Sequence, residues 1–149
     1  MPDNKSSDIA KPVSAMGNEP MSLDESFHNC FFYFMQAVDV LSLDAEKQCE
    51  AMGNFNVAWE IQHDVRDGAA ALINWPIGYL SLTEQDAVSQ IALFLGELPE
   101  AALLPDHMQA MSHPAWVDLR IAAKRLRVQL DDAVKKNREY FKKKMAQHK

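Results

Sequence analysis

Two Glu-x-x-His spacings contain the residues of this sequence that are best suited to chemistry. Glu25 is followed three positions later by His28, and Glu60 by His63. Residues three apart share one face of an α-helix, and di-metal centres in helical bundles take Glu and His ligands at this spacing. The pattern raises the hypothesis of an enzyme that holds a metal ion or a small molecule in the core of a helical bundle.

The surroundings of both pairs argue against a metal site. Ser22 and Glu25 frame a capping box, in which the Glu side chain is expected to bond the start of a helix. Glu60 lies about 170° around its predicted helix from the apolar stripe, so it points away from a core. The apolar seams of the other two predicted helices contain no carboxylate. We therefore expect no metal, no cofactor and no enzymatic activity.

The remaining reactive residue types are scattered along the chain. His107, His113 and His148 have no metal-ligand spacing. Cys30 and Cys49 both lie in helical patterns, which favours free, buried thiols over a disulfide. The sequence has no Gly-rich phosphate loop and no nucleophile elbow. We predict no catalytic residue.

The sequence indicates a cytoplasmic protein that does not enter a membrane. It has no run of about 18 apolar residues, the length that a membrane-spanning helix needs. Its first residues lack the basic start and apolar middle of a secretory signal.

The net charge of −6 conceals a strong asymmetry along the chain. Residues up to Leu119 include 4 Lys and Arg against 18 Asp and Glu, whereas residues from Arg120 onward include 11 against 3. Such an asymmetry concerns partners or self-association and not the fold. The basic end, with Tyr140 and Phe141 among its lysines, has the composition of a phosphate-binding patch. The acidic remainder would repel nucleic acid, so we interpret this end as a solvated helix terminus.

Length and hydrophobic pattern predict one helical domain over residues 21–149. A chain of 149 residues can bury roughly 68–70% of its unfolded surface in a single core. Residues 1–20 contain three prolines and no apolar period, which predicts a flexible tail. Met21 directly precedes the first helix signal, so Met1 and Met21 are both candidates for the biological start.

Apolar periodicity and capping signals predict an all-α chain that forms a four-helix antiparallel bundle-like domain. Ser22 and Ser81 open capping boxes, and Pro114 suits the first position of a helix capped by His113 or Ser112. The expected helices cover residues 22–41, 43–74, 81–96 and 114–144.

The second of these helices is expected to be the centre of the fold. Its apolar stripe falls within less than a half-turn and comprises Ala51, Phe55, Ala58, Ile61, Val65, Ala69 and Leu72. Gly68 marks a candidate kink or a place where another helix approaches closely. In the third helix we expect Phe94 to point inward.

An acidic surface is the most promising binding feature of the sequence. It is expected to collect Asp39, Asp44, Glu46, Glu50, Glu60, Asp64 and Asp67. We predict that Glu60, Asp64 and Asp67, with Asn56 and Trp59 beside them, bind a basic protein partner, since complementary charge speeds and selects association. A small acidic helical protein without catalytic residues fits an inhibitor: an immunity protein, an antitoxin or an anti-defence protein.

A self-assembling structural or adaptor bundle is the alternative. The first predicted helix is apolar nearly all round, because Phe32, Tyr33, Met35 and Val40 lie outside its main stripe. A helix of this kind is typical of a bundle centre or an interface. The basic last helix of one subunit would then lie against the acidic face of another, giving a homo-oligomer.

Overall fold

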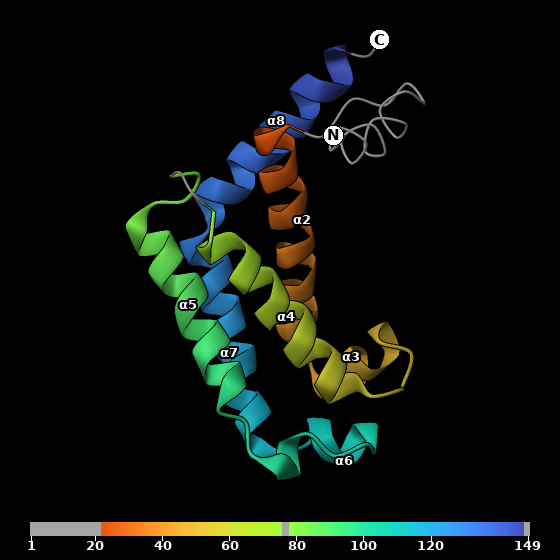
Figure 1. Ribbon diagram of the computed structural model, residues 1–149. Coiled ribbons are helices and arrows are strands. Elements are labelled where there is room, and N and C mark those ends of the chain that lie inside the picture. The colour runs from red at the N-terminus through yellow and green to blue at the C-terminus, as the bar shows by residue number, and fades with distance from the viewer. Residues whose placement is uncertain (1–21, 76–77, 148–149) are drawn as a thin grey trace, which may run out of the picture.

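The computed structural model describes residues 22–75 and 78–147, and this part of the chain is helical without strands. The all-helical class is therefore confirmed. No helix in these ranges is long and apolar enough to cross a membrane. The predicted tail and the two candidate start residues lie outside the described ranges. The elements in Figure 1 are α2 (Leu23–Leu41), α3 (Ala45–Ala51), α4 (Val57–Ile73), α5 (Leu82–Gly96), η1 (Glu100–Ala102), α6 (His107–Met111), α7 (Pro114–Gln129) and α8 (Asp131–Gln147).

The predicted capping residues begin α2, α5 and α7. Ser22 Oγ accepts a hydrogen bond from the backbone N–H of Glu25, while the Glu25 carboxylate lies 2.7 Å from Lys144 Nζ. Ser81 and Glu84 form the complete capping box of α5. Pro114 is the first residue of α7, and His113 Nδ1 accepts from the N–H two residues on, at 3.0 Å. Local side-chain chemistry thus determines where these helices start.

The predicted long helix over residues 43–74 is wrong, because the chain breaks into α3 and α4. Gly53, Asn54 and Asn56 have φ values of 73°, 58° and 47°, and residues in this left-handed region cannot continue a right-handed helix. The N–H of Gly53 bonds to Glu50 O and that of Asn54 to Cys49 O, which is a Schellman motif that satisfies the last carbonyls of α3. Glycine at the second position after the helix is what this motif favours.

The break changes which residues of the predicted stripe are buried. The members within α4 are almost fully covered: Ala58, Ile61, Val65, Ala69 and Leu72. In contrast, Ala51 at the end of α3 is exposed, and Phe55, in the segment between α3 and α4, is 73% exposed. The helical phase of α4 was therefore predicted correctly and its beginning was not.

Gly68 permits a close contact between α4 and α2 and does not break the helix. An added Cβ would lie 3.0 Å from Cδ1 of Phe34, which is buried. The close approach that the sequence suggested is confirmed, and the kink is not, since α4 runs continuously from Val57 to Ile73.

The last predicted helix also divides into two. Leu130, with φ −98° and ψ 12°, separates α7 from α8, and its side chain is fully buried. Among the described residues of α8, only Ala133 and Asn137 are buried. The row of buried apolar side chains therefore continues across Leu130, but fewer side chains are buried on α8 than on α7.

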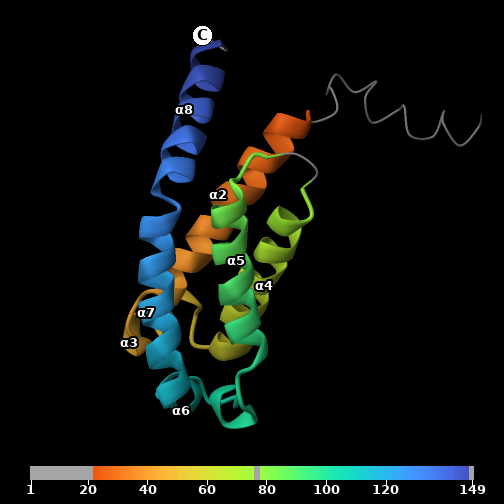
Figure 2. The ribbon, with the colours of Figure 1, turned by 90° about the vertical axis from the view of Figure 1, so that its left-hand side faces the viewer.

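Four long helices pack against one another around the buried residues. Helix α2 contacts α4 and α7, α4 contacts α5, and α5 contacts α7. Successive helices of this set run in alternating directions (Figures 1 and 2). Helices α3 and α6 lie together at one end, and α8 extends beyond the other end. Our finer expectation of a four-helix antiparallel bundle stays a prediction.

A buried polar network joins the short helices to the long ones. Gln48 is completely buried; its Nε2 donates to Leu41 O, and its Oε1 accepts from Nε and Nη2 of Arg120 at 3.0 and 2.8 Å. Arg120 also donates to Met111 O. Burial lowers the pKa of the Arg120 guanidinium. The network connects α2, α3, α6 and α7 at one end of the molecule.

Candidate functional site

The five residues predicted to bind a partner lie along one side of α4. Asn56 is the N-cap residue, and Trp59, Glu60, Asp64 and Asp67 follow at helical spacing. Asn56, Asp64 and Asp67 are exposed, Trp59 is 48% exposed and Glu60 is half-buried. We call these five residues the acidic stripe.

The carboxylates of the acidic stripe repel one another. Partial burial raises the pKa of Asp64, and the neighbouring charges of Glu60 and Asp67 raise it further, against a smaller opposing effect of His63. Within the described ranges, no lysine or arginine forms a salt bridge with any of the three carboxylates. Their negative charge is therefore available to a partner.

Aromatic side chains lie beside these charges. The rings of Trp59 and His63 stack with centroids 3.7 Å apart, and His63 Nδ1 lies 2.9 Å from the Trp59 carbonyl oxygen. Phe55 is exposed at the start of the stripe, where the left-handed Asn56 begins α4 without a side-chain capping bond. We had expected Phe55 in the core. The Gly-Asn-Phe-Asn sequence around it was the signal for an exposed turn.

The other acidic residues assigned to this surface have different positions. Asp44 caps α3 by accepting from Lys47 N–H at 2.9 Å, and Asp39 forms a salt bridge with Arg127 on α7. Glu46 and Glu50 are exposed on α3. The predicted acidic surface is therefore divided among α3, the salt bridge between α2 and α7, and the acidic stripe on α4.

A groove between α2 and α4 borders the acidic stripe. It has a volume of about 570 Å³ and is lined by Asp64 and Asp67 together with Tyr33, Ala37 and Gly68, among others. Tyr33 is 66% exposed. The groove thus joins the carboxylates to an aromatic surface on α2.

The two Glu-x-x-His pairs do not meet. His28 Nδ1 lies 2.6 Å from Asn137 Oδ1, and its ring stacks on Tyr140 at 4.0 Å. Glu25 pairs with Lys144, whereas the second pair is on α4. In the described part of the chain, no three His, Cys, Asp or Glu side chains are close enough to hold a metal ion.

The cysteines are both free. Cys49 is buried, with Sγ 3.6 Å from Met108 Sδ, and burial raises the pKa of its thiol. A thiol in this state is a packing group and a poor nucleophile.

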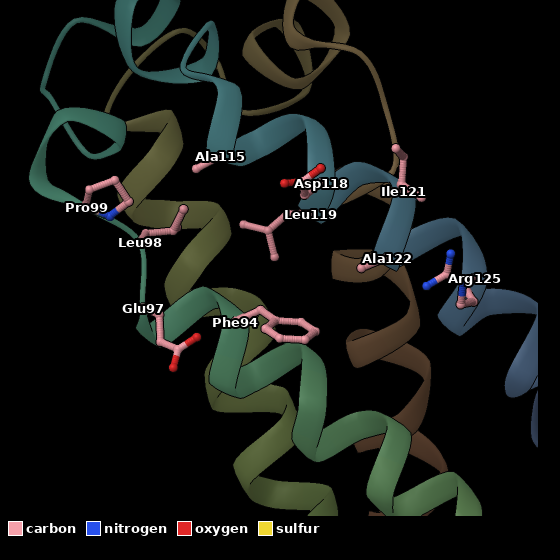
Figure 3. Close-up of a pocket in the computed structure, with 10 residues that line it drawn as sticks. All are labelled: Phe94, Glu97, Leu98, Pro99, Ala115, Asp118, Leu119, Ile121, Ala122 and Arg125. Carbon is pink, nitrogen blue, oxygen red and sulfur yellow. The ribbon is translucent and has the colours of Figure 1, made fainter.

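A second groove, between α5 and α7, was not anticipated (Figure 3). It has a volume of about 480 Å³ and is lined by apolar side chains, with Glu97, Asp118 and Arg125 around them. Phe94, which we expected in the core, is 49% exposed and lies on this groove. The correction arises because α5 carries apolar residues on more than one side, and only Val88, Ile91 and Leu95 of this helix are buried.

A third groove, of about 610 Å³, lies between α2 and α8. Its apolar side chains include Phe32, Phe141 and Met145, and Arg138 and Lys142 also line it. The sequence did not indicate this groove, because its two walls are about a hundred residues apart in the chain.

Comparisons of the chain with protein-family models, with curated proteins and with solved structures found no match.

Proposed function

We propose that this chain is a non-enzymatic binding protein whose acidic stripe docks a basic protein partner and inhibits it. An immunity protein, an antitoxin or an anti-defence protein acts in this way. The observation that carries the proposal is the row of three carboxylates that form no salt bridge with a described lysine or arginine, beside the exposed side chains of Phe55 and Trp59.

Charge and aromatic area have different roles in such a contact. Clustered carboxylates attract a basic surface over a distance and accelerate encounter, typically by about 10- to 1,000-fold at low salt. Aromatic side chains supply most of the binding free energy once water is displaced. Phe55 and Trp59 provide the aromatic area here, and Glu60, Asp64 and Asp67 provide the charge.

In this proposal, α2, α4, α5 and α7 form an antiparallel four-helix bundle that holds the stripe rigid. The opposite side of α4 is buried in the core along its length. A site on a rigid helix loses little conformational entropy on binding, so more of the contact energy appears as affinity.

The first experiment compares capture from a lysate of the source organism by the wild-type chain and by a variant with Glu60→Lys, Asp64→Lys and Asp67→Lys, which we call the stripe variant. The proposal predicts a basic protein that the wild type retains and the stripe variant loses. Circular dichroism should give both the same helical signal, because solvated charges contribute little to stability.

A matched control variant carries Asp86→Lys, Glu97→Lys and Asp118→Lys. These three residues are exposed on the α5–α7 side, and the control changes the net charge by the same amount. It should retain the captured protein. If it loses the protein as the stripe variant does, net charge and not the acidic stripe explains the binding.

Inhibition is tested on the purified partner. The activity of the partner, for example nuclease activity or toxicity, should fall when the wild-type chain is added. It should stay unchanged when the stripe variant is added. A partner that binds through the stripe without losing activity would refute the inhibitory part of the proposal and leave the binding part.

A further inference from the structure

A row of basic residues on α8 matches the acidic stripe in length. The first and last residues are seven positions apart in both rows, which are Lys135, Arg138 and Lys142 on α8 and Glu60, Asp64 and Asp67 on α4; this is about 10 Å of helix in each case. We call Lys135, Arg138 and Lys142 the basic edge.

Two of the three residues of the basic edge have no salt-bridge partner among the described residues. Lys135 is 3.0 Å from Asp131, whereas Arg138 and Lys142 form no salt bridge with any described carboxylate. Both line the groove between α2 and α8. A basic surface next to apolar side chains is therefore open to an acidic partner.

Helix α2 separates the two charged rows. Figure 2 shows α4 on one side of α2, and α7 and α8 on the other. The groove that contains Asp64 and Asp67 and the groove that contains Arg138 and Lys142 share one residue, Tyr33, among their aromatic members. One surface thus carries negative charge, an exposed apolar ridge and positive charge, in that order.

We infer that two copies of this chain form a dimer in which the basic edge of each copy covers the acidic stripe of the other. The acidic stripe lies toward the Leu41 end of α2, because Gly68 faces Phe34, and the basic edge lies toward the Leu23 end, because Asn137 contacts His28. A half-turn about an axis in the shared surface, perpendicular to the line that joins the two rows, exchanges them and brings each basic edge over an acidic stripe. A half-turn about the line that joins the rows would place stripe over stripe and edge over edge. Like charges opposed in an interface are unfavourable, so charge selects the first arrangement.

Exposed apolar side chains on α2 and α8 support a second copy of the chain as the molecule that binds this surface. Phe32, Tyr33 and Met145 are 43%, 66% and 69% exposed. Only Ala133 and Asn137 are buried on α8, which extends beyond the other helices in Figures 1 and 2. Isolated helices of this length are marginal in water, and burial of these side chains by a second copy would stabilise α8.

The inference rests on the proposed function, because it assigns to the acidic stripe the same affinity for a basic surface. It adds a form of regulation. A basic protein must displace the α8 of the second copy before it reaches the stripe, so the dimer binds the partner only after dissociating.

Analytical ultracentrifugation of the full chain tests the dimer. The wild type should sediment as a dimer, and the stripe variant as a monomer, with a dimer dissociation constant raised at least about 100-fold. The edge variant, with Lys135→Glu, Arg138→Glu and Lys142→Glu, should also be monomeric. The control variant should remain dimeric.

Mixing the stripe and edge variants gives the decisive result. The stripe variant presents two basic surfaces and the edge variant two acidic ones. Two copies of the same variant should therefore repel each other, whereas one copy of each variant should associate. An equimolar mixture should form heterodimers. Single substitutions Asp64→Lys and Arg138→Glu repeat the test with a smaller disturbance, should either triple variant be unfolded by circular dichroism.

A wild-type monomer at submillimolar concentration would overturn the inference, as would a dimer that survives both reversals. A monomeric wild type whose stripe variant still loses the basic partner would refute the dimer and leave the proposed function. A dimer that both reversals dissociate, with partner binding unchanged in the stripe variant, would refute the proposed function and leave the dimer.

Discussion

Phe34 and Gly68 illustrate how single residues decide where two helices meet. The glycine has no Cβ, and Phe34 occupies the space that a Cβ would need. Phe34 is buried, and the close approach predicted at Gly68 is confirmed. The helical pattern could not predict that these two residues contact each other, because apolar spacing gives the inward side of a helix and not its neighbour.

Gly68→Ala should destabilise the protein by up to about 2 kcal/mol. Alanine gains about 1 kcal/mol of helix propensity, but overpacking a buried contact costs about 1–3 kcal/mol. The control is Gly96→Ala, where the new Cβ would be 3.5 Å from the flexible Arg66 side chain; it should be neutral or stabilising. Urea unfolding measures both. Equal effects of the two substitutions would contradict the packing assigned to Gly68.

Asp64 gives a prediction about pH. Burial and the charges of Glu60 and Asp67 raise the pKa of Asp64 in the folded protein, so the folded state keeps this proton to a higher pH than the unfolded chain. The stability contributed by Asp64 is therefore present below the ordinary aspartate pKa of 3.8 and is lost as the pH rises through the raised folded value.

Asp64→Asn removes this loss. The free energy of unfolding of the variant, relative to wild type, should increase between about pH 3.5 and pH 7. Glu60→Gln should produce part of the same change, because it removes one of the charges that raise the Asp64 pKa. Parallel pH profiles of wild type and Asp64→Asn would mean that the carboxylates do not interact in solution.

At the scale of elements, the sequence predicted the outer boundaries of the helices but not the breaks inside two of them. Ser22, Ser81 and Pro114 act through side-chain or ring geometry that is local, so their positions were readable. The break after α3 depends on three left-handed residues, which leave no trace in apolar spacing because the period of Ala51 and Ala58 continues across it. Gly53 is the residue of the sequence that indicates this break, because glycine favours the left-handed region.

The joint at Leu130 was missed for a related reason. Its side chain is buried and keeps the apolar seam of α7 and α8 continuous, although its backbone leaves the helical region. A seam can thus continue where a helix does not. The sequence predicted one side of the candidate site, on α4, but not the grooves, whose walls come from helices distant in the chain.

The Gln48 network should hold the short helices in place. Gln48→Leu removes the acceptor of two Arg120 hydrogen bonds and should reduce the free energy of unfolding by about 2–3 kcal/mol, the cost of leaving a buried donor unpaired. Adding Arg120→Met should recover part of the loss, because both polar partners are then gone. The exposed Gln90→Leu is the control and should change stability by less than about 0.5 kcal/mol.

At the scale of the whole molecule, acidic and basic residues lie on opposite sides of α2. The acidic stripe lies on the α4 side and the basic edge on the α8 side. Composition revealed the two halves of this asymmetry, but only the packing of α4 and α8 against opposite flanks of α2 places them on one surface. In our proposals, the acidic stripe therefore serves both a basic partner and a second copy of the chain.

The association rate of the captured partner with the wild-type chain, the stripe variant and the control variant, measured by stopped-flow over a range of salt concentrations, tests the acidic stripe most directly. We expect the stripe variant to associate at least about 10-fold more slowly at low salt, with a smaller difference at high salt, where screening weakens the attraction. The control variant should match the wild type. A folded stripe variant that associates as fast as the wild type at every salt concentration would contradict the proposed function.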